Sequence, residues 1–181
     1  MRLFIAILFD QEIKTSLYET VEKLKQSAMG GNFTELEKLH LTVNFIGETK
    51  RLEEVKYAMR TAVEASKAEG FPLRLQGFGR FKRMEGDIYW VGVEQNDVLW
   101  RLQKELVKKL KEAGFYEIDD RDYKPHLTLG RKVRVGQAFD SKAFEAGIRP
   151  LQVKVEKISL MKSERIEGRL TYTEIYQVGL K

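Results

Sequence analysis

The amino-acid sequence predicts an α+β fold whose strands form mixed or largely antiparallel sheets. Its 181 residues are 43% hydrophobic and 33% charged, a composition typical of a globular protein with a buried core. Apolar patterns of strand and helix type alternate along the chain, and several predicted strands are joined by turns too short for a parallel crossover. Because no stretch rich in Pro, Gly and Ser divides the chain, residues 1–181 are expected to form a single domain.

The first predicted elements are a strand, a helix, a second strand and a second helix. Residues 2–9 form a continuous apolar run typical of a buried strand, and Asp10 can cap the helix that follows. The glycine pair at 30–31 is expected to end this helix. The second strand is predicted over 40–46, and the second helix is expected to stop near Gly70.

Two paired strands and a third helix come next. Residues 73–81 and 88–93 read as strands that turn at 84–87. The third helix is predicted to begin at Asn96 and to end at Gly114. Its inward stripe consists of Leu99, Leu102, Leu106 and Leu110.

The C-terminal part of the chain is predicted to consist mainly of strands. Pro125 disfavours helix for the residue before it, so 124–131 is interpreted as a strand. Residues 151–161 and 169–180 alternate in the manner of half-buried strands.

Composition excludes several classes of protein. The longest apolar run, Leu3–Phe9, is far shorter than the ~20 residues of a membrane helix, and no secretory signal is visible. The chain has no cysteine, so it has neither a disulfide framework nor a thiolate nucleophile. We therefore expect a cytoplasmic protein without a membrane partner.

The charge of the chain is unevenly distributed. Lys and Arg number 32 against 27 Asp and Glu, a net charge of +5. Two stretches are strongly basic: 124–165, and 70–84, whose basic residues are Arg74, Arg80, Lys82 and Arg83. Such stretches either steer a polyanion or form an ordinary solvated face, and charge alone leaves both readings open.

The two histidines of the chain begin the same short motif. His40-Leu41-Thr42-Val43 and His126-Leu127-Thr128-Leu129 both fall on predicted strands. Side chains alternate faces along a strand, so each His and its Thr point one way while the leucines point into the core. A lone strand histidine is most often structural, but the repeat favours two related lobes that meet at a cleft.

Paired imidazoles and hydroxyls suit acid/base chemistry at phosphorus. Neither histidine has a further ligand at zinc spacing, and no serine stands in a nucleophile-elbow motif. One neutral imidazole can take a proton from water while a second, protonated imidazole gives one to a leaving oxygen. Hydroxyl donors beside each histidine would stabilise the negative charge of a phosphorane. We expect no metal and no cofactor.

The chain resembles the two-histidine phosphoesterase superfamily and, within it, the RNA 2′,3′-cyclic phosphodiesterases formerly called 2′-5′ RNA ligases. The similar segments are MRLFIAI, LHLTVNFIGE, FGRF, YWVGV and YKPHLTLGR, which span residue 1 to about residue 131. Residues 132–181 match mainly in pattern and end in strands that would complete one lobe.

The resemblance implies a bilobal α+β fold of two related lobes, with helices outside and a central cleft carrying both H-x-T-x strands. It implies that His40 is the general acid and His126 the general base, and that Thr42 and Thr128 bind phosphate. The expected reaction is metal-independent hydrolysis of RNA 2′,3′-cyclic phosphate ends to 2′-phosphate. Reversal of this reaction would join RNA ends by a 2′-5′ linkage.

The resemblance also covers residues around the two motifs. Arg131 occupies the arginine of the family's HLTLxR segment and either contacts phosphate or pairs with an acid at the rim. Phe45 matches an aromatic of the first motif strand, but its parity places it with the leucines unless that strand is bulged. Arg2 and Tyr123 are interpreted as structural or rim residues.

The expected partner is an RNA or oligonucleotide with a 2′,3′-cyclic phosphate end. We expect a monomer with no obligatory protein partner. The alternative function is a nucleotide- or RNA-binding module of the same fold that does not turn its ligand over. Retention of both histidines and both threonines favours the enzyme.

Overall fold

The structure of the protein is a computed structural model that describes all residues, 1–181. In chain order its elements are β1 (Arg2–Leu8), α1 (Gln11–Ser27), β2 (Ala28–Phe33), the 3₁₀ turn η1 (Leu36–Lys38), β3 (His40–Glu48), α2 (Leu52–Ser66), β4 (Phe71–Phe81), β5 (Asp87–Val93), α3 (Asp97–Glu112), β6 (His126–Val135), α4 (Ser141–Ala146), β7 (Leu151–Val155), β8 (Lys157–Ile166) and β9 (Arg169–Gly179). No helix among them is both long enough and apolar enough to cross a membrane.

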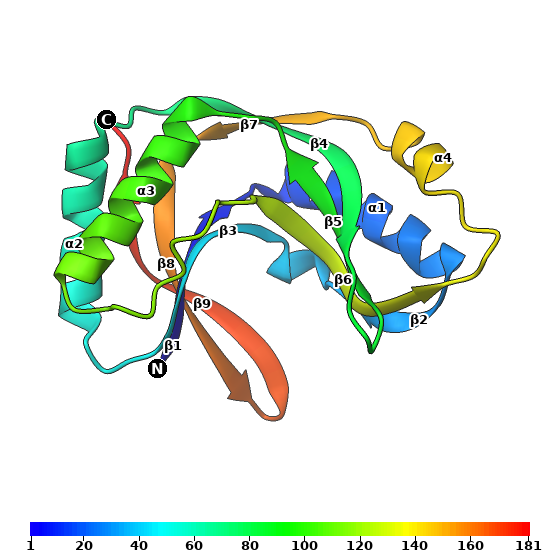
Figure 1. The fold of residues 1–181 in the computed structure, drawn as a ribbon, viewed down its shortest axis with the longest axis horizontal. Helices are drawn as coiled ribbons and strands as arrows, with labels where there is room; N and C mark the ends of the chain where they lie inside the picture. The colour runs from blue at the N-terminus through cyan, green and yellow to red at the C-terminus, as the bar shows by residue number, and fades with distance from the viewer.

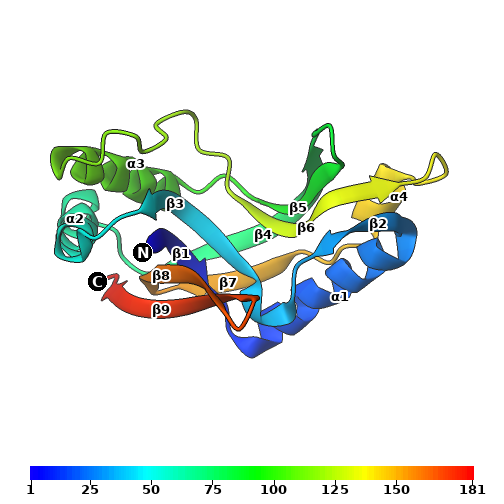
Figure 2. The same ribbon diagram turned by 90° about the horizontal axis from the view of Figure 1, so that it is seen from below.

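The strands form two antiparallel sheets, which confirms the predicted fold class. One sheet has the order β3-β1-β8-β9 and the other β2-β6-β5-β4-β7. Each sheet combines strands from early and late in the chain: β8 and β9 complete the sheet of β1 and β3, and β7 completes the sheet that contains β2. Helices α2 and α3 lie together at one end of the molecule and α1 and α4 toward the other, as Figure 1 and Figure 2 show.

The predicted apolar faces form the core. Asp10 caps α1 by accepting a hydrogen bond from the backbone N–H of Ile13, 2.9 Å away. The four leucines of the third helix are completely buried on α3. They belong to one cluster of 34 buried residues that draws side chains from both sheets. The two sheets are therefore packed on a continuous core.

One strand was not predicted, because a glycine pair was mistaken for a helix stop. Helix α1 ends at Ser27, and Gly30 and Gly31 lie inside β2, which pairs with β6. Gly31 has a φ of +150°, and a Cβ atom there would lie 3.0 Å from Val133. The backbone of β2 thus needs glycine to approach its neighbour.

Other boundaries also differ from the prediction. Residues 151–161 form two strands in different sheets, β7 and β8, which are separated at Glu156. Helix α2 ends at Ser66 rather than near Gly70, because Lys67 adopts the left-handed conformation that closes the helix. The short helix α4 was not predicted. Alternation of apolar residues is a local property and does not reveal that a chain passes from one sheet to another.

Candidate active site

A cleft of about 1240 Å³ is lined by residues of both sheets, and both H-x-T-x motifs lie in it. The first motif begins β3, at the edge of one sheet, and the second begins β6 in the other sheet. Leu41 and Leu127 are completely buried, whereas the histidine and threonine of each motif line the cleft. The leucines thus point into the core and the His and Thr side chains into the cleft, as the sequence predicts.

The His40 ring is fixed at both nitrogens. Its Nδ1 lies 2.7 Å from the carbonyl oxygen of Lys38, and its Nε2 lies 2.9 Å from Oγ1 of Thr42. The carbonyl oxygen can only accept a hydrogen bond, so Nδ1 carries the hydrogen of the neutral ring. Nε2 therefore accepts a hydrogen bond from the Thr42 hydroxyl. Phe4 packs against the ring at a centroid distance of 5.0 Å, and Tyr172 meets it edge-on at 5.5 Å.

The His126 ring makes the same kind of hydrogen bond to a backbone carbonyl, but it has fewer hydrogen bonds than the His40 ring. Its Nδ1 lies 2.7 Å from the carbonyl oxygen of Lys124, again two residues before the histidine. Its Nε2 has no hydrogen-bond partner within the protein, unlike that of His40. Both rings therefore carry their hydrogen on Nδ1 and leave Nε2 for proton transfer.

The environment of the cleft favours neutral imidazoles. Burial lowers the pKa of His40 below its ordinary value of 6.5, and the charge of Arg131 and the nearby His126 lower it further. Burial, then the charge of Arg131, also lowers the pKa of His126. In each case the hydrogen bond to the backbone carbonyl opposes this effect. At pH 7 both rings are mainly neutral in the free protein.

The backbone of each motif is anchored at its threonine. The phenol of Tyr123 donates to the carbonyl oxygen of Thr42 at 2.8 Å, and burial raises the pKa of Tyr123. The hydroxyl of Thr34 donates to the carbonyl oxygen of Thr128, also at 2.8 Å. Tyr123 therefore has the structural contact expected of it, and Thr34 is a support that sequence reasoning missed.

Phe45 lies in the cleft, contrary to the expectation from an ideal strand. In the pairing of β3 with β1, Thr42 is opposite Ala6 and Asn44 is opposite Ile5, so Val43 is an extra residue. This bulge reverses the alternation, and Phe45 is 57% exposed and lines the cleft. The core-packing interpretation of Phe45 is wrong because the strand is bulged.

The cleft collects basic side chains that lack acidic partners. Arg131 is exposed and forms no ion pair, so its predicted pairing with a rim acid is not observed. The cleft-lining basic residues without an ion pair are Arg2, Arg83, Lys124 and Arg131. The sequence indicates Arg2 as a structural or rim residue, whereas it does not single out Arg83 and Lys124 as site residues, although they lie in the basic stretches.

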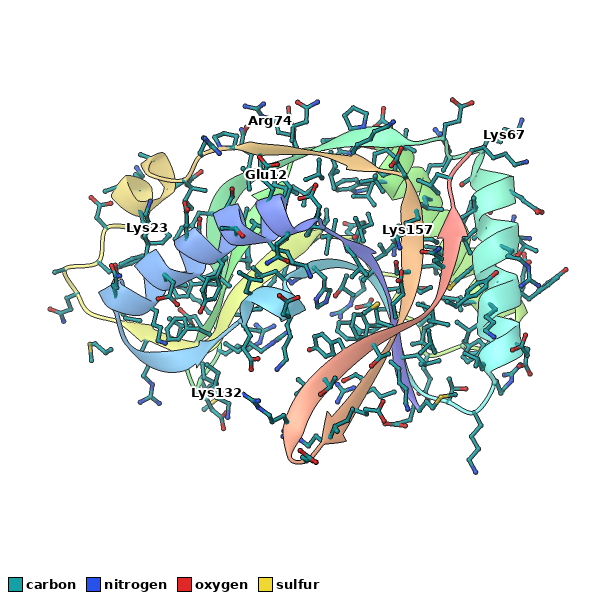
Figure 3. The ribbon with its side chains drawn as sticks, turned by 180° about the vertical axis from the view of Figure 1, so that it is seen from behind. Glu12, Lys23, Lys67, Arg74, Lys132 and Lys157 are labelled. Carbon is teal, nitrogen blue, oxygen red and sulfur yellow. The ribbon has the colours of Figure 1, made fainter.

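Much of the other predicted basic surface is neutralised by neighbouring strands. Arg80 pairs with Asp87 at 2.8 Å, and Arg74 pairs with Glu94 at 3.6 Å. Arg74 does not line the cleft, and Figure 3 shows it at the edge of the molecule opposite the β8–β9 hairpin. The acids come from β5 and the residues after it, so the sequence around the arginines does not reveal them. No group of three or more His, Asp or Glu side chains is arranged to hold a metal ion.

Comparison with known proteins shows which family this chain is similar to. The model of the 2′-5′ RNA ligase superfamily matches residues 13–167. An RNA 2′,3′-cyclic phosphodiesterase of Thermotoga maritima is 30% identical over 98% of this chain and 94% of its own, and one of Methanothermobacter thermautotrophicus is 28% identical over 97% and 96%.

Solved structures share the fold. A Thermus thermophilus protein is 26% identical, with a TM-score of 0.77 over 99% of this chain and 98% of its own. E. coli LigT, solved in a complex with 3′-AMP, is also 26% identical, with a TM-score of 0.74 over 99% of this chain and 96% of its own.

Proposed function

Because the chain belongs to the 2′-5′ RNA ligase superfamily, we propose that it hydrolyses the 2′,3′-cyclic phosphate at an RNA end to a 2′-phosphate. Relatives that match nearly the whole chain carry the name RNA 2′,3′-cyclic phosphodiesterase. The observation that carries the proposal is the pair of histidines, each with hydrogen on Nδ1, in one cleft with both threonines.

In the proposed reaction the two histidines move one proton each. Nε2 of neutral His126 takes a proton from water as the water oxygen bonds to phosphorus. Nε2 of protonated His40 gives a proton to the 3′ oxygen as its bond to phosphorus breaks. The products are a 2′-phosphate and a free 3′-hydroxyl, and the second proton balances the first.

The acid role of His40 requires a proton that the free protein holds weakly. The pKa of His40 is lowered by burial in the free protein, and the opposite charge of a bound phosphate anion would raise it. Once Nε2 is protonated it no longer accepts the hydrogen bond from the Thr42 hydroxyl, whose hydrogen is then free to bind a phosphate oxygen, and the Nε2 hydrogen is available to the leaving 3′ oxygen. Thr128 and Arg131 would stabilise the charge that develops on the same phosphate oxygens.

An aromatic surface beside His40 suits the nucleobase. Phe45, Phe4 and Tyr172 form a chain of ring contacts, with centroid distances of 5.9 Å between the first two and 5.1 Å between the last two. All three line the cleft. Unpaired RNA bases are commonly bound by stacking on such rings. We assign Phe45 to base stacking on this surface.

A short oligonucleotide with a 2′,3′-cyclic phosphate end provides the direct test. Incubation with the protein is expected to give a 2′-phosphate, identified by phosphorus NMR, and the product is expected to be the same in EDTA. Production of a 3′-phosphate would contradict the assigned leaving group. Binding without turnover would instead support the RNA-binding module, and loss of activity in EDTA that a divalent ion restores would contradict metal-free chemistry.

The salt dependence of oligonucleotide binding tests whether Arg83 contacts the RNA backbone. For single strands, log affinity falls with log salt by about 0.7 per phosphate neutralised. The variant Arg83→Gln is therefore expected to flatten the slope for an oligonucleotide by about 0.7. Arg74→Gln, outside the cleft and paired with Glu94, should leave it unchanged. Fluorescence anisotropy at several salt concentrations measures both slopes, and equal slopes for the two variants would assign Arg83 to the ordinary solvated surface.

A further inference from the structure

The two active-site histidines differ in how their rings are held. His40 has hydrogen bonds at both Nδ1 and Nε2. His126 has one at Nδ1 only, so its hydrogen bonds within the protein leave Nε2 without a fixed partner. In the proposed reaction the Nε2 atom of His126 must meet a water molecule in line with the bond that breaks. Some other contact must therefore fix this ring before the substrate arrives.

Two aromatic rings meet His126 on the face of the β4–β5–β6 sheet that carries it. The Phe81 ring lies edge-on to the imidazole at a centroid distance of 4.9 Å, and the Trp90 ring lies 6.3 Å from it. The two aromatic rings also contact each other at 5.5 Å. Trp90 is opposite Thr128 in the strand pairing, so its side chain shares the face of the second motif. We call Phe81 and Trp90 the aromatic wall.

The chain leaves room for the indole with a glycine. Gly79 is opposite Trp90 in the pairing of β4 with β5. A Cβ atom on Gly79 would lie 2.4 Å from both Cη2 and Cζ2 of the indole, which is closer than real atoms approach. The φ angle of Gly79 is not in the left-handed region, so its backbone would accept alanine. Glycine is required at position 79 for the space and not for the backbone.

The indole acts here through its ring and not through its N–H group. The Trp90 Nε1 atom is buried and has no hydrogen-bond partner. An unpaired buried donor contributes no favourable bond and costs desolvation, so replacing it with a carbon ring loses no hydrogen bond. Packing area and shape are what Trp90 supplies beside His126.

We propose that Trp90, together with Phe81, is a positioning residue that holds the His126 ring for proton transfer, and that Gly79 is there to admit the indole. The inference rests on the proposed function, since it gives the wall a purpose in that reaction. Trp90 does not line the cleft, so it acts through His126 and not on the substrate. His40 also has two aromatic neighbours, Phe4 and Tyr172, but its Nε2 is held by Thr42 as well, whereas the Nε2 of His126 has no protein partner and its ring depends more on the aromatic wall.

The variant Gly79→Ala tests the wall with one added methyl group. We expect kcat/KM to fall about 10- to 100-fold because the displaced indole moves His126, with most of the loss in kcat. Gly30→Ala is the matched control, since Gly30 lies on β2 of the same sheet and a Cβ atom there would have no neighbour within 4 Å. It is expected to retain the wild-type rate.

A second readout follows the histidine itself and does not need turnover. The chain has only two histidines, so NMR resolves each ring and one His→Asn variant assigns them. Trp90→Leu is expected to raise the pKa of His126 toward 6.5, because burial is the main cause that lowers it. The charged and titratable groups near the ring, Arg131 and His40, are unchanged in this variant. Trp90→Phe keeps a ring and should leave both the pKa and the rate near wild type.

The experiments separate the outcomes. Tyr172→Leu removes a ring that contacts His40 and is expected to change the titration of His40 and not that of His126. The double variant Gly79→Ala/Trp90→Leu should be no worse than Trp90→Leu alone, because both changes act through one ring. Additive losses, or an unchanged His126 titration in Trp90→Leu, would overturn the proposal. If the wild-type protein is inactive but Trp90→Leu raises the pKa of His126 as expected, the proposed function is refuted and the positioning role of the aromatic wall stands.

Discussion

Replacing either His126 or His40 with alanine is expected to lower kcat/KM for an RNA 2′,3′-cyclic phosphate by roughly 10²- to 10⁴-fold. Each change removes one of the two proton transfers of the proposed reaction. The double variant should lose less than the product of the two single losses, because residues that work as a unit are not additive. Initial rates with a cyclic-phosphate oligonucleotide measure all three values, and circular dichroism shows whether each variant is folded.

A modified substrate separates the acid from the base. Sulfur in place of the bridging 3′ oxygen leaves without protonation, so this substrate should restore His40→Ala selectively. Restoration of His126→Ala instead would exchange the two roles. Equal behaviour of the two variants would contradict a division into one acid and one base.

The pH profile follows from the lowered histidine pKa values. The kcat/KM of the free enzyme needs one neutral and one protonated imidazole, and burial lowers the pKa of both rings below 6.5. We therefore expect a bell-shaped profile whose maximum lies on the acid side of 6.5 and whose limbs belong to the pair. In the kcat profile the alkaline limb should move to higher pH, since bound phosphate raises the pKa of the acid. An alkaline optimum for kcat/KM would contradict two neutral resting histidines.

Removal of either motif hydroxyl is the second large effect that we expect. Thr42→Val and Thr128→Val keep the side-chain shape but remove a donor to the charged phosphate, and each should lower kcat by about 10²- to 10³-fold. Thr42→Ser and Thr128→Ser are the matched controls, because they restore the hydroxyl. Single-turnover rates with a cyclic-phosphate dinucleotide measure the effect.

The two threonines are not equivalent, which gives a further check. Thr42 is bonded to Nε2 of His40, whereas Nε2 of His126 has no protein partner. Thr42→Val should therefore change the titration of His40, and Thr128→Val should leave that of His126 as it is. A valine variant that retains the wild-type rate would remove that threonine from the phosphate site.

Several features of the fold could be predicted because they depend on neighbours in sequence. The leucine stripe of α3 and the apolar run of β1 are periodic, and periodicity identifies an element and its buried face. The boundaries that failed depend on distant partners. Gly30 and Gly31 look like a helix stop until β6 is known to lie beside them. The division of 151–161 into β7 and β8 likewise follows from two different neighbours, β4 and β1.

The sequence by itself determined which side chains of the two motifs lie together, because the repeat of His and Thr two residues apart on strands places those side chains on one face. It also placed Arg131 beside the second motif. Only the tertiary structure decided where Phe45 points, since the bulge at Val43 exists only in the pairing of β3 with β1. It also decided which arginines form ion pairs, because Asp87 and Glu94, which lie outside the basic stretch, pair with Arg80 and Arg74. Register and ion pairing are non-local interactions between segments, whereas the motif is a property of a few adjacent residues.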